Sequence, residues 1–242
     1  MGLLSKAKPV TESNQGKLVV LYGKSNSGKT TLASTFPKPI LYIVVADDGI
    51  SSVSKVDGVD CIEVEKCQDI NSVLDELMKD TQYATVVVDT FSLYTNMWIT
   101  ENVTSKKKKM TQQAWGDLKT ETEELIRLAS KLSKNKWVVL TCHEAADAFE
   151  GLEDEITPDI RPSVSKGART YLEGMANYGI HTTKLKKVVE QDGVEKTLVK
   201  YGAHIGPNEY YWTKLQIARD VKVPQIIVNP SFDKLIKITK GE

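Results

Sequence analysis

The sequence predicts an α/β protein built on a mostly parallel central sheet, with helices on both faces and a β-hairpin extension toward the C-terminus. Short apolar runs rich in β-branched residues alternate with segments of helical periodicity, which is the pattern of strand–helix–strand units. The apolar runs are continuous, as expected of strands buried on both faces. After about residue 179, two strand-like runs surround the turn signal Gln191-Asp192-Gly193, which predicts the hairpin.

The strands are predicted from the apolar runs along the chain. Residues 1–16 are polar and contain Pro9, so a flexible lead-in is expected before the first run. The shortest run, Cys61–Val64, should lie near an edge of the sheet. The predicted strands are Lys17–Tyr22, Ile40–Ala46, Cys61–Val64, Thr85–Val88 and Trp137–Thr141.

Three helices are predicted between these strands. Thr30–Phe36 should end at Pro37, because proline cannot continue a helix. Asp69–Asp80 carries apolar residues at helical spacing, with Asp69 suited to the first turn. The third helix, Trp115–Leu132, has the clearest pattern. It carries a stripe that predicts a face packed into the core, made of Trp115, Leu118, Thr122, Leu125, Ala129 and Leu132.

The C-terminal part is expected to form the hairpin and a tail that packs on the core. The hairpin strands are predicted at Ile180–Val189 and Lys196–Tyr201. The tail should hold a short helix near Lys214–Asp220, followed by turns at Pro224 and Pro230.

The composition is that of an ordinary globular protein. Of the 242 residues, 40% are hydrophobic and 26% charged, which argues against a disordered or fibrous chain. Lysine and arginine total 32, as do aspartate and glutamate, so the formal net charge is zero. A protein that coats nucleic acid through bulk charge is therefore not expected, and any such binding must come from local patches.

The cysteines and the apolar runs indicate the cellular compartment expected for the protein. Cys61, Cys67 and Cys142 are odd in number and lack C-x-x-C spacing, so neither a disulfide framework nor a zinc ribbon is predicted. A reducing cytoplasm suits such a chain. The longest apolar runs, such as Ile40–Ala46, are far shorter than the roughly 18 residues of a membrane span. With no signal peptide visible, a cytoplasmic protein without membrane contact is expected.

A phosphate-binding loop is predicted where Gly23–Thr30 match G-x-x-x-x-G-K-[ST] between a strand and a helix. Gly23 and Gly28 allow the tight turn that points successive backbone N–H groups into one concavity. Lys29 should reach the β- and γ-phosphates, and the Thr30 hydroxyl should bind Mg²⁺. The expected ATP-binding residues are Gly23, Lys24, Ser25, Asn26, Ser27, Gly28, Lys29, Thr30 and Thr31.

Other polar residues follow the ends of strands and complete a predicted catalytic set with Lys29. Asp89 ends an apolar strand, so it should hold Mg²⁺ through water opposite Thr30. His143 ends another strand at the same edge, where it could sense the γ-phosphate. Asp47 and Asp48 could orient the attacking water, although Asp-Asp-Gly is equally typical of a solvated turn. The other histidines and the cysteines lack metal-ligand spacing, so no metal cluster is expected.

The segments GKSNSGKTT, ILYIVVADDG, TVVVDT, QQAWGDLKTETEELIRLASKL and WVVLTCHE, in this order, resemble RecA-type P-loop ATPases. More narrowly, they are similar to small phage AAA-type nucleotide-binding proteins related to the RecA-like single-strand annealing (Sak) group. The resemblance covers about Lys17 to His181 and, more loosely, the tail. It implies a RecA-like P-loop NTPase core at 17–181, between a lead-in at 1–16 and a hairpin with tail at 182–242. If the chain is phage-encoded, its place is the host cytoplasm.

The resemblance also assigns roles to residues near the γ-phosphate. In this family an acidic residue after the second strand activates water, and Asp48, followed by Gly49, matches that position best, with Asp47 next. The family more usually has glutamate there, and the shorter aspartate favours weak turnover. The residue at the end of the fourth long strand is the sensor, which corresponds to His143.

RecA-type proteins carry two DNA-binding loops, which correspond here to about Thr100–Gln113 and Ala145–Lys166. The first holds a lysine tract that suits phosphate contacts, or is simply a solvated charge run. The second holds acidic residues that would repel phosphate, so it could swing away or contact a basic partner protein. The implied DNA contacts are Lys106, Lys107, Lys108, Lys109, Arg161, Lys166 and Arg169.

RecA-type ATPases often complete the site with a cation from the next subunit, which implies a homo-oligomer. The candidates, each of which could equally be a solubilising charge, are Lys184, Lys186, Lys187, Lys214 and Arg219. The aromatic run Tyr210-Tyr211-Trp212 could stack on bases or pack in the core or an interface.

Three functions are compatible with these residues. The first is a Mg²⁺-dependent ATPase that acts on single-stranded DNA in phage recombination or annealing, with a single-strand-binding or other recombination protein as a further partner. The second is an ATP-binding switch with little turnover that recruits a partner protein. The third, a nucleotide kinase, would need a lid with several arginines, and Glu144–Ser165 contains only Arg161.

Overall fold

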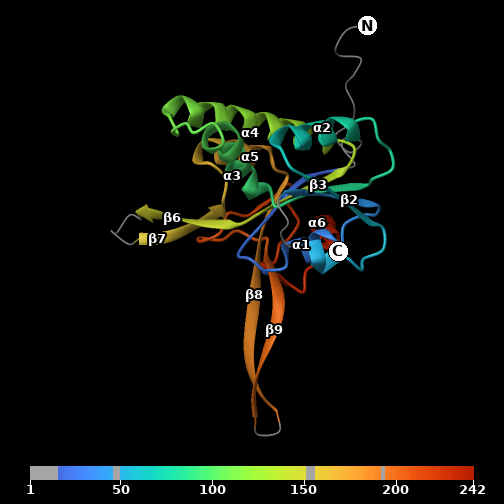
Figure 1. Ribbon diagram of the computed structural model, residues 1–242. Helices are drawn as coiled ribbons and strands as arrows, with labels where there is room; N and C mark the ends of the chain where they lie inside the picture. Colours follow the sequence, from blue (N-terminus) through green and yellow to red (C-terminus); the bar gives the residue numbers. More distant parts are fainter. Residues whose placement is uncertain (1–15, 46–49, 151–155, 192–193) are drawn as a thin grey trace.

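The computed structural model describes residues 16–45, 50–150, 156–191 and 194–242. A central sheet lies between two layers of helices, and two β-hairpins extend from it in different directions (Figure 1). Most of the predicted lead-in lies outside the described residues. Gly16, the last residue of that segment, is buried, and a methyl group on it would lie only 1.9 Å from the backbone oxygen of Lys136.

The described residues form a nine-stranded sheet in the order β11-β9-β8-β1-β5-β4-β2-β3, with β10 beside β8. Strands β8, β1, β5, β4, β2 and β3 run parallel, and β9, β10 and β11 are antiparallel to their neighbours. The five strands predicted before residue 150 are confirmed, with β3 at an edge. They are β1 (Leu18–Tyr22), β2 (Ile40–Val45), β3 (Val59–Val64), β4 (Thr85–Asp89) and β5 (Trp137–Cys142).

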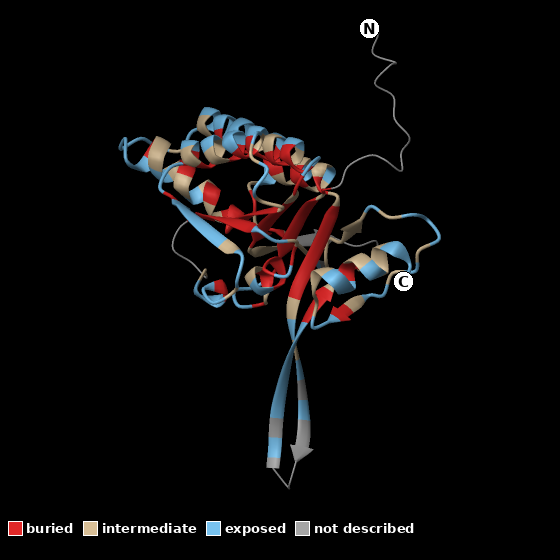
Figure 2. Cartoon of the chain, turned by 90° about the vertical axis from the view of Figure 1, so that its right-hand side faces the viewer, coloured by how far each residue is buried: buried red, intermediate tan, exposed pale blue. Residues whose placement is uncertain are grey.

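The strands are buried on both faces, which explains their continuous apolar sequences. In β1, Leu18, Val20 and Tyr22 belong to one core cluster, and Val19 and Leu21 belong to the other. Figure 2 shows the buried residues concentrated in the sheet. The first cluster packs against α2 (Cys67–Leu77), α3 (Tyr94–Ile99), α4 (Gln112–Leu132) and α5 (Lys166–Met175), and the second against α1 (Lys29–Ala33) and α6 (Phe232–Lys240).

The helices differ from the predicted ones mainly at their ends. Helix α1 ends at Ala33, earlier than expected, and turns lead to Phe36. Helix α2 begins before Asp69, because the Asp69 carboxylate accepts a hydrogen bond from the backbone N–H of Lys66 (2.9 Å) and caps the first turn. Helix α4 begins at Gln112, where Thr111 Oγ1 accepts a hydrogen bond from the Ala114 N–H (3.1 Å).

Trp115 is the exception in the predicted apolar stripe of α4. The other members are buried, namely Leu118, Thr122, Leu125, Ala129 and Leu132, but Trp115 is 50% exposed. Its side chain lines a cavity between α3, α4 and α5 instead of entering the core. The prediction that Trp115 packs in the core is therefore wrong.

The two segments expected as DNA-binding loops differ: Ala145–Lys166 is mostly regular structure, whereas residues 105–111 of the first segment, which include the lysine tract, form a turn and irregular chain. Ala145–Lys166 falls largely in a two-stranded antiparallel sheet of β6 (Glu144–Glu150) and β7 (Ile156–Pro162), which leads into α5. Among the described residues these strands pair with each other and, through one isolated bridge, Ile160 pairs with Tyr211. They lie outside the central sheet, so no long apolar run marks them in the sequence. Thr100–Gln113 begins with a π-helical turn, Thr100–Thr104, and ends in α4.

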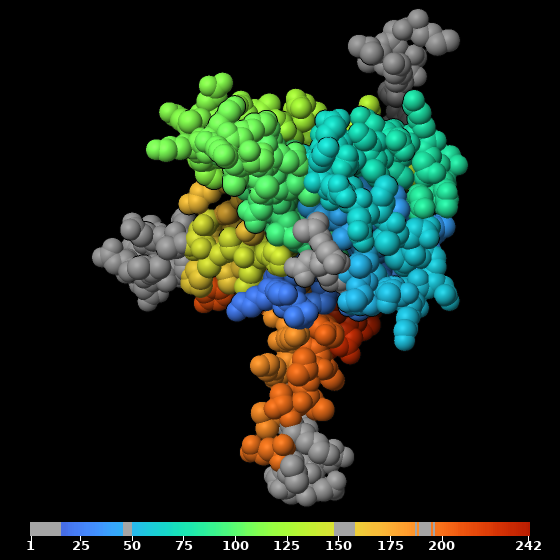
Figure 3. Space-filling model, in the orientation of Figure 1, coloured from blue at the N-terminus to red at the C-terminus, as the bar shows by residue number. Residues whose placement is uncertain are grey.

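The predicted β-hairpin is confirmed and is longer than expected. Strands β8 (Tyr178–Gln191) and β9 (Val194–His204) pair from His181↔His204 to Gln191↔Val194. The hairpin projects from the body of the protein (Figures 1 and 3). Its base belongs to the central sheet, because β8 also pairs with β1, up to Tyr22↔His181. Residue 181, the expected end of the core, thus lies inside β8.

The predicted helix at Lys214–Asp220 is wrong. Lys214 and Leu215 form β10, which pairs with Gly179 and Tyr178 of β8, so this backbone completes its hydrogen bonds in the sheet. The tail continues into β11 (Ile226–Val228) and α6, neither of which was predicted. Within the described part of the chain, no helix is both long and apolar enough to cross a membrane.

Candidate functional site

The phosphate-loop motif connects the end of β1 to the start of α1. Gly23 and Gly28 have φ angles of 155° and 95°, which side-chain-bearing residues rarely adopt. A methyl group on Gly23 would lie 2.3 Å from the backbone oxygen of Thr182. The loop therefore needs glycine at these two positions for backbone conformation, and at Gly23 also for close packing against β8.

Neighbouring strands hold this loop in place. Ser27 Oγ and Thr182 Oγ1 share a hydrogen bond of 2.6 Å, which ties the loop to β8. The Gly23 N–H donates to the Cys142 backbone oxygen at the end of β5 (3.3 Å). Tyr42 on β2 donates from its hydroxyl to the Thr30 backbone oxygen (3.0 Å). Contacts from β2, β5 and β8 thus preorganise the loop.

The Lys29 ammonium group is held inside the loop. Lys29 is 6% exposed, and its Nζ donates to the backbone oxygens of Gly23 (3.1 Å) and Lys24 (2.9 Å). A lysine is a compact charge on a flexible stem. The side chain can therefore exchange these carbonyl contacts for phosphate oxygens without a change in the backbone.

Asp89 is the centre of a group of three threonine hydroxyls. Its Oδ2 accepts a hydrogen bond from Thr30 Oγ1 (2.8 Å), and its Oδ1 accepts from Thr90 (3.0 Å) and Thr141 (2.5 Å). Mg²⁺ prefers oxygen ligands and is usually bound by one or two carboxylates together with substrate phosphates and water. The Thr30 hydroxyl and the Asp89 carboxylate fit this requirement.

The phosphate loop, Asp89 and His143 line one cavity of about 210 Å³. Its other lining residues include Ser51 and Ser52 of a short 3₁₀ turn and Tyr201 of β9, which were not predicted. A methyl group on Gly28 would lie 2.9 Å from Cδ1 of Tyr201, so this ring covers the end of the loop. No local motif marks Tyr201, because it reaches the site only through the pairing of β9 with β8.

His143 lies directly after β5, at the edge predicted for it. Its backbone N–H donates to Ser92 Oγ (3.0 Å), and its side chain is half-buried. His143 also lines a second, larger cavity beside the first. Asp47 and Asp48, the predicted water-positioning residues, lie outside the described part of the chain.

Beside the phosphate loop lies a buried cluster of aromatic and ionisable residues that was not predicted. His181 Nε2 is 2.8 Å from Glu144 Oε2, and the His181 ring stacks on Tyr211 with centroids 3.9 Å apart. Burial lowers the pKa of His181 and also that of its cross-strand neighbour His204. Burial likewise raises the pKa of the Cys142 thiol to about 12, so this cysteine stays protonated at neutral pH.

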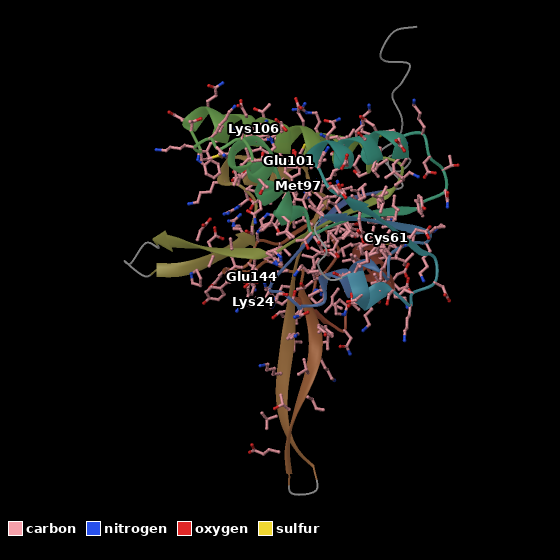
Figure 4. All side chains as sticks on the ribbon, viewed as in Figure 1. Lys24, Cys61, Met97, Glu101, Lys106 and Glu144 are labelled. Atoms are coloured by element: carbon pink, nitrogen blue, oxygen red, sulfur yellow. The ribbon has the colours of Figure 1, made fainter. Side chains whose placement is uncertain are left out.

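The implied DNA contacts differ in how accessible they are. Lys106–Lys109 are exposed, and Lys106 donates to Asn102 Oδ1 (3.1 Å). Figure 4 shows Lys106 in the helical layer and Lys24 on the other side of the sheet. Arg161 pairs with Asp159 (2.6 Å) and Glu173 (3.0 Å), and Arg169 pairs with Asp147. The side chain of Lys166 is 84% exposed, 4.0 Å from Asp147.

The cations that could complete a neighbouring subunit's site also differ in how accessible they are, and so do the three residues of the aromatic run. Lys214 Nζ donates to the backbone oxygens of Glu173 and Gly174 (2.9 Å each) near the end of α5, whereas Lys184, Lys186 and Arg219 are exposed. The Lys187 side chain lies outside what the structure describes. Tyr211 stacks on the His181 ring. Trp212 packs directly on Gly179 of β8, where a methyl group would lie only 2.5 Å from its ring. Tyr210 is 45% exposed.

A strand, a glycine-bounded loop and a helix, with a lysine, a threonine and a strand-end aspartate at one sheet edge, define the P-loop NTPase class. A family model described as an AAA domain matches residues 15–203. The chain belongs to this AAA domain family and is an AAA-type P-loop NTPase. The family implies binding and hydrolysis of ATP, typically with Mg²⁺. A search of curated proteins finds no match.

Proposed function

We propose that this protein is a Mg²⁺-dependent, RecA-like ATPase that acts on single-stranded DNA in recombination or annealing, as in the phage Sak-related group that it resembles. One observation carries the ATPase part. Lys29 and Thr30 of α1, Asp89 at the end of β4 and His143 after β5 meet around a single cavity of about 210 Å³.

Each residue has a role in this proposal. Lys29 neutralises charge on the β- and γ-phosphates, while Thr30 and Asp89 hold the Mg²⁺ that spreads this charge further. Thr141 keeps the Asp89 carboxylate oriented by donating to Oδ1. Asp48, or Asp47 beside it, positions the attacking water, and His143 senses the γ-phosphate.

The DNA part of the proposal rests on local charge and on the resemblance. Lys106–Lys109 are exposed on the helical layer. The formal net charge of the chain is zero, so attraction of DNA has to come from such a local cluster. A homo-oligomer would bring an exposed lysine of the projecting hairpin, Lys184 or Lys186, to a neighbouring subunit's site.

A specific observation favours the second candidate, an ATP-binding switch that recruits a protein. The Arg161 and Arg169 guanidinium groups are already paired with carboxylates at β6, β7 and α5. Two of the implied DNA-binding cations are therefore engaged within the chain. A surface of mixed charge of this kind suits a protein partner.

The test is steady-state ATP hydrolysis with and without a single-stranded oligonucleotide at low salt, with Lys29→Ala as the inactive reference. Turnover that DNA stimulates would support the ATPase proposal. ATP binding without turnover, with or without DNA, would favour the switch. Phosphate transfer to an added nucleoside or nucleotide would overturn both and indicate a kinase.

A further inference from the structure

A second cavity of about 700 Å³ lies beside the nucleotide pocket. It is formed by the α3 region, the first turns of α4, the segment after β7 and the start of α5. Cavities of this size hold small organic ligands. His143 lines both cavities, and its backbone N–H donates to Ser92 Oγ, which lines the second one.

Two lysines add positive charge to the largely apolar lining of this cavity. Among the described residues that line it, two are lysines and none is acidic. The Lys119 and Lys166 side chains are 51% and 84% exposed, and their carboxylate partners lie at 3.8 and 4.0 Å, the outer limit of an ion pair. Both ammonium groups can therefore turn toward a phosphate at little cost.

The same cavity presents an aromatic surface and open space beside it. Trp115 is half exposed on its wall, although the rest of the α4 stripe is buried. A methyl group on Gly116 would meet nothing within 4 Å, so the space beside Trp115 is open. An exposed aromatic face, open space beside it and two positive charges together suit a nucleotide.

The surroundings favour a strand over a free mononucleotide. The lysine tract borders another hollow of about 730 Å³, lined in part by Lys106, Lys108 and Lys109 and also by Asp117 and Glu121. The first turns of α4 line both hollows, through Trp115 and Gly116 on one side and Gln113 and Asp117 on the other. A single strand could therefore cross α4 from one hollow to the other.

We propose that the second cavity binds one nucleotide unit of a single-stranded nucleic acid, with its base stacked on Trp115 and its phosphate between Lys119 and Lys166. This site rests on the proposed function and locates the strand beside the nucleotide pocket. Because His143 lines both cavities, strand binding contacts the residue that faces the γ-phosphate side. Stacking of a base on an aromatic ring tolerates any sequence, so the site binds with little base preference.

The test measures binding of a fluorescent oligothymidylate by anisotropy at low salt. Removal of the stacking ring in Trp115→Ala should weaken binding about tenfold, and Trp115→Phe should retain most of it. Gly116→Glu, which places volume and negative charge in the open space, should weaken binding, whereas Gly116→Ala should not. Ile62→Ala removes an exposed apolar side chain of the edge strand β3 that lines neither hollow, and it serves as the control.

Each outcome separates this site from the proposed function. ATP affinity without DNA is measured in parallel, so a variant that misfolds loses both affinities. If the wild-type protein binds DNA but Trp115→Ala and Gly116→Glu bind it equally well, the cavity is not the strand site and the proposed function stands. If thymidine monophosphate binds as tightly as the oligonucleotide with the same dependence on Trp115, a free nucleotide is the ligand and the strand proposal is overturned. If wild-type protein binds no oligonucleotide, the proposed function itself fails.

Discussion

Thr30 Oγ1 donates a hydrogen bond of 2.8 Å to Asp89 Oδ2, although the two residues come from different elements of the fold. Thr30 belongs to α1, directly after the phosphate loop, and Asp89 ends β4. Strand β5 lies between β1 and β4 and contributes Thr141, which donates to the other oxygen of the same carboxylate. The position of the carboxylate thus depends on three elements at one edge of the sheet.

Thr141→Val should raise the Mg²⁺ concentration needed for half-maximal ATP turnover by about 10- to 100-fold, because the carboxylate loses a group that orients it. The measurement is a Mg²⁺ titration of ATPase activity. Thr122→Val removes another buried hydroxyl, which donates to the Leu118 backbone oxygen within α4 and does not line the nucleotide cavity. An equal shift in both variants would mean that the effect is general and not due to Asp89.

Lys29→Ala should reduce ATP turnover by about 100-fold or more and weaken ATP binding, because the β- and γ-phosphates lose their buried cation. ATP affinity by calorimetry and turnover by phosphate release measure the two effects. Lys55→Ala, which removes an exposed lysine outside the cavity, is the matched control. Unchanged affinity and turnover in Lys29→Ala would contradict the assignment of the phosphate loop.

The parts of the site that the sequence could predict are those encoded locally. One local motif contains Gly23, Gly28, Lys29 and Thr30. Asp89 ends an apolar run that predicts a parallel strand, and the carboxyl ends of parallel strands lie at one edge of the sheet. Tyr201 could not be predicted in this way, because it reaches the cavity only when β9 folds back along β8. A residue such as Tyr201, which reaches the site through the pairing of distant strands, has no motif around it in the sequence that links it to the phosphate loop.

The fold shows the same distinction. The buried parallel strands were predictable because each is a continuous apolar run. The segment of β6 and β7 was expected to be a loop from the resemblance to RecA-type proteins, and it lacks an apolar run that would have indicated its strands. Periodicity also placed Trp115 in the core, because spacing alone does not show that the first turn of α4 borders a cavity.

Replacement of Lys106–Lys109 by alanine should weaken binding of single-stranded DNA and reduce its salt dependence. Each lost phosphate contact should lower the slope of log K against log salt by about 0.7. The measurement is oligonucleotide affinity across a salt series, with the exposed residues Lys131 and Lys134, near the other end of α4, replaced by alanine as the control. A slope equal to that of the wild-type protein would remove the lysine tract from the DNA-binding surface.

Acidification from pH 7.5 to pH 5.5 should lower the free energy of unfolding through His181 and His204. Burial is the main cause that lowers both pKa values in the folded state; for His181, the nearby charges of His204 and Lys29 add to it and Glu144 opposes it. The unfolded chain, whose histidines have pKa values near 6.5, therefore binds protons at a higher pH than the folded protein does. Stability is fully present above this pH and falls as the pH decreases toward the folded-state pKa values, by at most about 1.4 kcal/mol per pH unit for each histidine.

Urea unfolding at pH 7.5, 6.5 and 5.5 measures this dependence. The double variant His181→Gln/His204→Gln should be less stable at pH 7.5, because it disturbs the contacts with Glu144 and Tyr211, but its stability should change less over this range. Most carboxylates titrate below pH 5. Burial raises the pKa of Glu173, so its protonation opposes the histidine effect equally in both proteins, and the histidine contribution is the difference between their slopes. The same pH dependence in the wild-type protein and the double variant would show that the two imidazoles take up protons in the folded state as readily as in the unfolded chain.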